Sequence, residues 1–255
     1  MTESLETVVA RLEGLLEETR QDNQRLLRAV DALEIQNVMS WHEFYHMVGN
    51  HADEMGAIWA QKTPGLAMEE AVLRGRYEGL EAVRRYYVDF FKSFDKTMLE
   101  EARRLYPQVE TEPEADRPFG VRLIHTLTTP LIEVAEDRQT AKGVWMSPGL
   151  VTAPAGGKLQ AFWHWDRYAI DFIREEGRWK IWHFWVGKEF STPYDRSWVD
   201  DFFQAPGVSL ENVPGFPKPN APSMTDYRGY NPFEAAQWVP RPPEPYRTFS
   251  ETFSY

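Results

Sequence analysis

The sequence predicts a protein of the α+β class, in which helices pack on one face of a mostly antiparallel sheet. Helical patterns dominate residues 4 to 94, and strand patterns dominate residues 121 to 190. Runs of helices followed by runs of strands joined by short turns are typical of this class. The length of 255 residues suits one large domain with extensions. We expect three parts: an N-terminal helix over 1–34, an α+β domain over 35–200, and an extended arm over 201–255.

The first helix, predicted over residues 4–37, contains no proline and a single glycine. Positions spaced alternately by four and three residues are mostly apolar and form a heptad seam: Leu5, Val9, Leu12, Leu16, Thr19, Asn23, Leu26, Val30 and Leu33. Asn23 occupies an a-type position, where an amide fixes the register and number of helices at some cost in stability. The seam therefore indicates self-association through this helix. An amphipathic helix packed on its own domain would show a similar pattern.

The helical pattern continues through residues 35–49, where four ring-bearing residues crowd one turn. Trp41 and Tyr45 are four residues apart, and so are His42 and His46, so each pair shares a face. Two histidines at this spacing can bind a metal, but a site needs a third ligand, and the sequence contains no HExxH motif. We therefore expect no metal here. Residues 50–60, which include Trp59, are predicted to form a second, short helix.

Residues 73–94 are predicted to begin with a short strand and turn and to end in an amphipathic helix. Its aromatic stripe is best explained by core packing. Residues 106–118 are acidic and contain proline, so we expect a surface loop. Residues 121–135 and 140–152, which carry His125 and Trp145, are predicted to form a hairpin.

The most aromatic stretch, residues 159–190, is predicted to form a long hairpin with a tight turn at Glu176 and Gly177. A two-residue turn pairs 172 with 181 and 168 with 185. On that register one sheet face carries His164, Asp166 and Tyr168 together with His183 and Trp185, whereas Arg167 lies on the other face. A slip of one residue would reassign these partners.

The arm, residues 203–255, contains ten of the eighteen prolines, a density that disfavours regular helix or sheet. It is nevertheless rich in aromatic residues, unlike a disordered tail. We expect an extended segment pinned along the domain or a neighbouring subunit by Phe216, Tyr227, Tyr230, Phe233, Trp238, Tyr246, Phe249 and Phe253.

Composition excludes several classes of partner and site. The net charge of −11 argues against nucleic acid or an anionic membrane as partner, because binding phosphate needs a basic surface. The absence of cysteine removes disulfides, thiolate metal sites and a cysteine nucleophile. The sequence shows neither a signal-peptide pattern nor a run of about 20 apolar residues that could cross a membrane. We expect a cytoplasmic protein.

Several stretches resemble the SnoaL-like proteins of the nuclear-transport-factor-2-like superfamily. They are GRYEGLEAVRRY at 75–86, AKGVW at 141–145 and RYAIDFIREEGRWKIWH at 167–183. The resemblance covers residues 30–192 and is more specific for fold than for function. It implies a cone: a curved, mostly antiparallel sheet wrapped on helices, with a deep apolar pocket at one end.

In the enzymes of that family, catalytic groups usually lie on the first helix and on the inner sheet face. The resemblance therefore implies catalytic roles for Tyr45, His46, His125, His183 and Asp166. We expect the substrate to contact Trp41, His42, Trp59, Trp145, His164, Arg167, Tyr168 and Trp185. The helix aspartate common in related enzymes is not evident, since Gly49 and Asn50 stand near its place.

These residues suit a cofactor-independent lyase or dehydratase of a small aromatic, phenolic molecule. Histidine carries protons near neutral pH, and tyrosine can hydrogen-bond a phenol or carbonyl oxygen. The resemblance extends to SnoaL-like lyases that release formaldehyde from diarylpropanes. The alternative is a non-catalytic protein that binds a small molecule or directs assembly through the same pocket. We expect no cofactor.

Overall fold

The computed structural model describes residues 4–111, 117–202 and 213–255. Parts of the predicted loop (112–116) and arm (203–212) lie outside this range. Helices make up most of residues 5–105, as the sequence predicts. They are α1 (Leu5–Met47), α2 (His51–Ile58), the 3-10 turn η1 (Ala71–Leu73), α3 (Leu80–Arg84), the π-helical turn η2 (Arg85–Phe90) and α4 (Phe91–Leu105).

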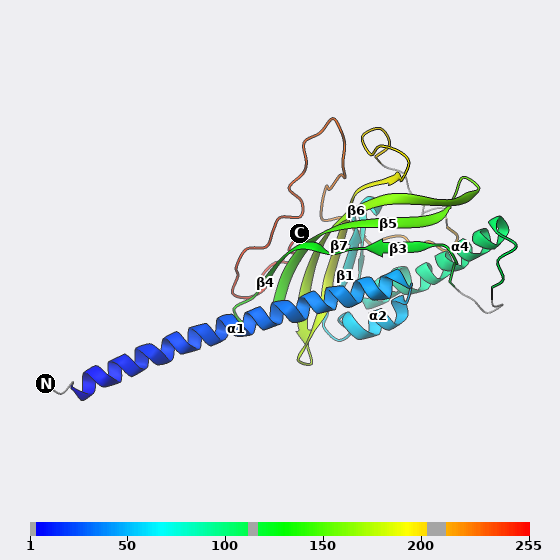
Figure 1. The fold of residues 1–255 in the computed structure, drawn as a ribbon. Helices are drawn as coiled ribbons and strands as arrows, with labels where there is room; N and C mark the ends of the chain where they lie inside the picture. The colour runs from blue at the N-terminus through cyan, green and yellow to red at the C-terminus, as the bar shows by residue number, and fades with distance from the viewer. Residues whose placement is uncertain (1–3, 112–116, 203–212) are drawn as a thin grey trace.

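Helix α1 is one unbroken element that runs through residue 34 into the domain (Figure 1). The Ser4 hydroxyl caps its start by accepting a hydrogen bond from the Thr7 amide at 3.2 Å. It ends where Gly49 adopts a φ of +66°, a conformation that glycine enters without strain. The first part of α1 extends away from the domain, and its seam residues are exposed.

The strands form one curved sheet. They are β1 (Ala67–Glu70), β2 (Gly75–Glu78), β3 (Arg122–His125), β4 (Thr128–Val134), β5 (Thr140–Ala155), β6 (Lys158–Glu175), β7 (Arg178–Pro193) and β8 (Ala221–Pro222). Their order is β3-β5-β6-β7-β1-β2-β8, and β4 also pairs with β5. All described pairings are antiparallel except that between β1 and β7. Both predicted hairpins are confirmed, although the first strand of the first hairpin is divided into β3 and β4.

The expected shared face of the β6–β7 hairpin is wrong beyond its first rungs. Phe172 pairs with Ile181 as predicted, but a β-bulge follows, so that Asp171 pairs with His183 and Ala169 with Trp185. An extra residue on one strand shifts every later side chain to the opposite face. His183 and Trp185 therefore face away from Tyr168.

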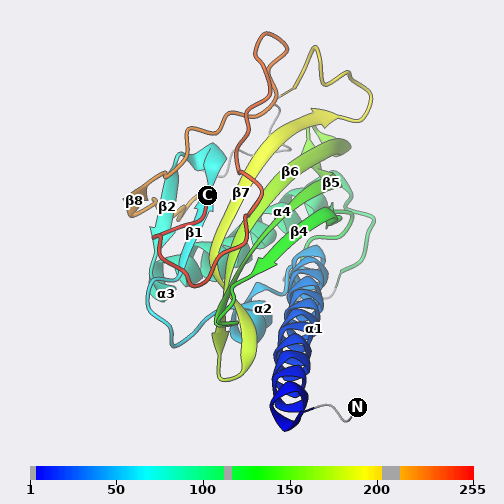
Figure 2. The same cartoon turned by 90° about the vertical axis from the view of Figure 1, so that its left-hand side faces the viewer.

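The main core lies between the helices and the concave face of the sheet, which gives the cone-shaped α+β fold. Fully buried residues come from both layers, including Ile35 and Met39 of α1, Trp145 of β5, and Phe172 of β6. Because the sheet curves around these helices (Figures 1 and 2), its concave face is turned toward the inner end of α1. Trp145 of β5 and Tyr168 of β6 contact Gln36 and His42 of that helix.

Asp31 fixes α1 to the sheet. It is 1% exposed, receives hydrogen bonds from Arg138 and Arg174, and lies 3.3 Å from the Trp179 indole nitrogen. Burial opposes ionisation, but the arginine and tryptophan contacts outweigh it and lower the pKa of Asp31. The seam before Asp31 therefore belongs to a projecting segment, and the helix after it belongs to the core.

The described part of the arm is extended, as predicted, and crosses the convex face of the sheet (Figure 2). The Tyr227 ring packs on Trp185, and the Phe253 ring packs on His183. Phe233 and Trp238 are 91% and 73% exposed, so the expectation that they pin the arm is wrong.

No helix in the described part of the chain is long and apolar enough to cross a membrane.

Candidate active site

Five of the six histidines meet inside the cone. His42 and His46 come from α1, His51 from α2, His125 from β3 and His164 from β6. The ring centre of His46 lies 5.2 Å from that of His51, 5.4 Å from that of His125 and 5.7 Å from that of His42. Such a concentration of imidazoles in a core is costly unless their polar atoms find partners, so it marks this end of the cone as the candidate site.

On the helical side, the fully buried carboxylate of Glu54 joins three elements. It accepts hydrogen bonds from the Trp59 indole at 3.1 Å and from the Tyr87 hydroxyl at 2.9 Å, and lies 2.7 Å from His42 Nδ1. His51 Nδ1 is 3.5 Å away. One carboxylate thus orients two imidazoles, an indole and a phenol.

His42 and Glu54 form a buried ion pair. Burial disfavours both charges, but their mutual attraction and hydrogen bond outweigh it, so the pKa of Glu54 falls to about 2. The same interactions raise the pKa of His42 above its ordinary value against the effect of burial. His42 is therefore a charged donor, and its second nitrogen, Nε2, is buried with no partner within the described residues.

Glu43, the next residue on α1, is the opposite kind of carboxylate. Burial raises its pKa to about 7, although the nearby His42 lowers it. Both of its oxygens are buried and lack a hydrogen-bond partner among the described residues. A carboxyl with a pKa near neutrality and open lone pairs is suited to accept and release a proton.

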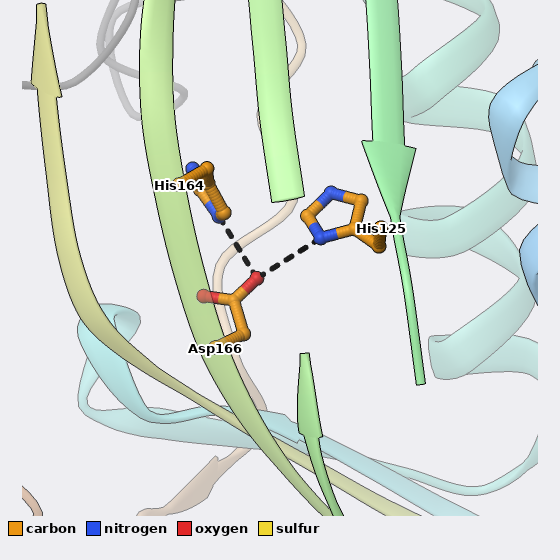
Figure 3. Close-up of side chains that lie close together, drawn as sticks. All are labelled: His125, His164 and Asp166. Carbon is orange, nitrogen blue, oxygen red and sulfur yellow. Dashed lines mark hydrogen bonds and ion pairs between the residues drawn. The ribbon is translucent and has the colours of Figure 1, made fainter. Parts of the chain in front are cut away.

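On the sheet side, Asp166 of β6 lies between two histidines (Figure 3). Asp166 Oδ2 is 2.8 Å from His164 Nε2 on the same strand and 3.4 Å from His125 Nδ1 on β3. Strand alternation puts 164 and 166 on the same face, and the pairing of β3 with β5 brings His125 over them. Burial opposes ionisation of Asp166, but attraction to His164 outweighs it and lowers the carboxyl pKa.

His46 lies between the two groups. Burial, followed by repulsion from His51 and His125, holds the pKa of His46 well below its ordinary value. Burial and repulsion from His164 lower the pKa of His125 to about 3. Both rings are therefore neutral at physiological pH.

Most of the predicted site residues lie in or beside this cluster. Tyr168 is 4% exposed, and its ring centre is 6.0 Å from that of His42. Trp59 is fully buried beside Glu54, and Trp145 donates from its indole to Gln36 of α1 at 3.0 Å. The structure thus brings together His42, His46, His125, His164, Asp166, Tyr168, Trp59 and Trp145.

Three other predicted site residues lie on the convex face of the sheet. His183 contacts Asp171 at 2.8 Å beneath the arm, and Trp185 donates to Thr225 of the arm at 3.0 Å. Arg167 pairs with Glu189 at 2.8 Å and donates to two arm carbonyls. The bulge and the strand alternation direct these side chains to the arm, so the expectation that they line the pocket is corrected.

Two more of the predicted site residues, Trp41 and Tyr45, lie on the outer side of α1. Trp41 is 58% exposed, and the half-buried Tyr45 packs its ring 5.7 Å from that of Trp41. They share a helix face, as predicted, but it is the face away from the interior. Trp41 therefore lies outside the buried cluster.

Sequence reasoning missed Glu43, His51, Glu54 and Tyr87. Glu43 follows His42 directly, and His51 and Glu54 share a face of α2 three residues apart. That spacing was the available signal for His51 and Glu54. For Glu43 the signal was a carboxylate at the end of a helix whose face was changing from polar to buried.

A comparison with protein families agrees with this fold. Residues 28–184 match the family model for a SnoaL-like domain. A search of curated proteins found no match. Among solved structures, a hexachlorocyclohexane dehydrochlorinase (LinA) of type 2 is 18% identical, with 73% of this chain and 99% of that chain covered and a TM-score of 0.47.

Two further structures come from Novosphingobium. The type 3 LinA of Novosphingobium barchaimii is 18% identical, with 72% and 99% of the two chains covered and a TM-score of 0.43. An NTF2-like protein with a cystatin-like fold from Novosphingobium aromaticivorans is 16% identical, with 77% and 94% covered and a TM-score of 0.37. At such identities, the reaction of this chain must be argued from its own residues.

Proposed function

The chain belongs to the SnoaL-like domain family, and from that premise we propose that it is a cofactor-independent lyase or dehydratase of a small phenolic molecule. Membership supports a reaction of the lyase or isomerase type. Such a reaction needs a base for one proton, an acid for the departing oxygen or enolate, and a site that excludes water. The interior of the cone contains residues for each role.

Glu43 is the base, and the buried position of its carboxyl, which raises the pKa to about 7, is the observation that carries the proposal. Both oxygens are buried and unpaired within the described residues, so they are available to a substrate proton. A base of this strength exchanges protons readily at neutral pH, and a well-placed one contributes about 10²–10⁴-fold to a rate.

His42 is the acid. Its pairing with Glu54 favours the imidazolium, and Nε2 is buried without a partner in the described structure. From there it can donate to a substrate oxygen on which charge develops as a bond to carbon breaks. The proton that Glu43 takes and the proton that His42 gives balance an elimination or a retro-aldol cleavage.

Aromatic side chains around the acid support a flat substrate. The ring centre of Phe184 lies 5.0 Å from that of His42, and Trp59 stacks on Phe184 at 5.3 Å. Aromatic rings prefer stacked or edge-to-face neighbours, which supports a phenolic substrate. Release of formaldehyde from a phenolic diarylpropane combines the two reactions. Loss of the benzylic hydroxyl as water gives a quinone methide, and deprotonation of the primary alcohol then expels formaldehyde while the carbon–carbon electron pair restores the phenol ring.

The experiment is a turnover screen with a panel of phenolic alcohols, including diarylpropanes, in which loss of water and release of formaldehyde are both measured. We expect wild type to convert at least one class and His46→Ala to be impaired, because His46 lies among the proposed groups. His183→Ala, on the convex face, should have the smaller effect on kcat/KM.

Binding without turnover across the panel would contradict the proposal and favour the non-catalytic alternative. So would equal losses in the two variants, provided that circular dichroism shows both to be folded.

A further inference from the structure

We propose that His125, His164 and Asp166 form a binding site for a divalent transition-metal ion of the zinc type. The three side chains each direct a ligand atom to one point, and these atoms all lie within 4.8 Å of one another (Figure 3). This inference goes beyond the proposed function, and it revises the sequence-based expectation of a site without metal.

The separations fit a small ion. Ligand atoms about 2.0–2.2 Å from a tetrahedral zinc ion lie roughly 3.3–3.6 Å from each other. His125 Nδ1 and Asp166 Oδ2 are 3.4 Å apart. His164 Nε2 and the same oxygen are 2.8 Å apart, so this contact would lengthen by roughly half an ångström to admit the ion.

The chemistry of the donors also fits. Two imidazoles and one carboxylate are a donor set of catalytic zinc and of other first-row metals, with at least one position left for water or substrate. All three side chains are buried, and His125 Nδ1, one of the three ligand atoms, has no hydrogen-bond partner among the described residues. A cation would give this buried nitrogen a partner.

His46 can supply a fourth ligand. Its ring centre is 5.4 Å from that of His125, and its Nδ1 is buried and unpaired within the described residues.

The test is a titration of the full chain, first treated with a chelator, with Zn²⁺ by calorimetry and with Co²⁺ by visible absorption. We expect one equivalent to bind and Co²⁺ to give the ligand-field bands of a four- or five-coordinate site. Asp166→Asn and His164→Ala should weaken binding by at least about 10–100-fold, the loss that changes outside the ligand set already cause.

His183→Ala is the matched control, because His183 is also a buried histidine 2.8 Å from an aspartate but lies on the convex face. Its binding should equal that of wild type. The proposal is overturned if wild type binds less than one equivalent or if Asp166→Asn binds as tightly. It is also overturned if His183→Ala loses as much affinity as His164→Ala. The titration needs no substrate, so its outcome is separate from that of the lyase proposal.

A different observation carries a second inference: we propose that the projecting part of α1 pairs with the same segment of a second copy. Six seam residues between 5 and 30 are 44–79% exposed: Leu5, Val9, Leu12, Leu16, Leu26 and Val30. A helix in a protein takes most of its stability from packing against other elements, and this segment projects from its own domain (Figure 1).

Asn23 argues for an identical partner. In a symmetric, in-register pair the two Asn23 amides meet and can hydrogen-bond each other, whereas an unrelated apolar surface would bury this amide unpaired. Replacing Leu12 and Leu16 by Glu in the full chain is therefore expected to lower the mass measured by light scattering by at least half.

The control is Gln21→Glu with Gln24→Glu, which adds the same two charges at exposed positions off the seam. A mass that is unchanged in the Leu12 and Leu16 variant, or reduced equally in the control, would overturn the pairing.

Discussion

Glu43→Gln is expected to lower kcat/KM by about 10²–10⁴-fold and, at the same time, to make the protein more stable. The loss follows because an amide cannot take a proton from the substrate. The gain follows because burying the Glu43 carboxylate is unfavourable: its pKa is about 7 in the folded protein against an ordinary 4.5. Active sites commonly contain such destabilising groups.

The pH dependence of the stability gain follows from linkage. A raised acid pKa means that the unfolded chain releases the proton first, so the penalty is absent below pH 4.5 and grows as pH rises to about 7. We expect urea unfolding at pH 8 to show Glu43→Gln more stable by about 1–3 kcal/mol and at pH 4 to show no gain.

The control is Glu18→Gln on the exposed part of the same helix. It should change neither kcat/KM nor the free energy of unfolding. If Glu43 is the base, kcat/KM of wild type should also rise with pH through about 7. Full activity in Glu43→Gln, or a stability that falls at pH 8, would contradict the assignment.

Glu54→Ala should lower the free energy of unfolding by about 3–5 kcal/mol, the usual cost of removing one partner of a buried ion pair. The substitution leaves His42 Nδ1, the Trp59 indole and the Tyr87 hydroxyl buried without their acceptor. Since a domain is stable by only about 5–15 kcal/mol, this variant should unfold in much less urea.

The control is Asp53→Ala, one position earlier in α2 and exposed, which should lower the free energy of unfolding by less than about 1 kcal/mol.

The ion pair between His42 and Glu54 should also stabilise the fold only within a limited range of pH. The lowered pKa of Glu54 contributes stability that is present above 4.5 and lost as pH falls toward about 2. The raised pKa of His42 contributes below 6.5 and is lost as pH rises past its folded value. A Glu54→Ala deficit that is no larger at pH 5.5 than at pH 2 would show that the pair does not stabilise the fold.

Most of the fold could be predicted because it depends on local periodicity. The run of apolar residues in α1 and the aromatic alternation of β6 and β7 are properties of neighbouring residues, and both elements are confirmed. The bulge near Asp171 could not be predicted in this way, because its two-against-one pairing depends on both strands at once. One such irregularity moved His183 and Trp185 to the convex face.

The site was predicted where the residue type was distinctive. Histidines are few enough to be noticed, and His42, His46, His125 and His164 do meet. The signal for Glu43 was weak, because its charge state depends on burial in the folded domain and on groups distant in sequence, such as Asp166. For Glu54 the local signal was its spacing of three residues from His51, which Asp53 does not share.

The bulge of β7 also suggests a route by which relatives could diverge. A single inserted residue acts as a phase shifter along the strand, so moving it by a few positions would exchange interior and exterior side chains without disturbing the hydrogen-bonded ladder on either side. His183 would then turn inward, whereas its partner Asp171, which lies on β6, would stay on the convex face, so the shift would also separate this pair. One indel, rather than many substitutions, could thus give this cone a new interior.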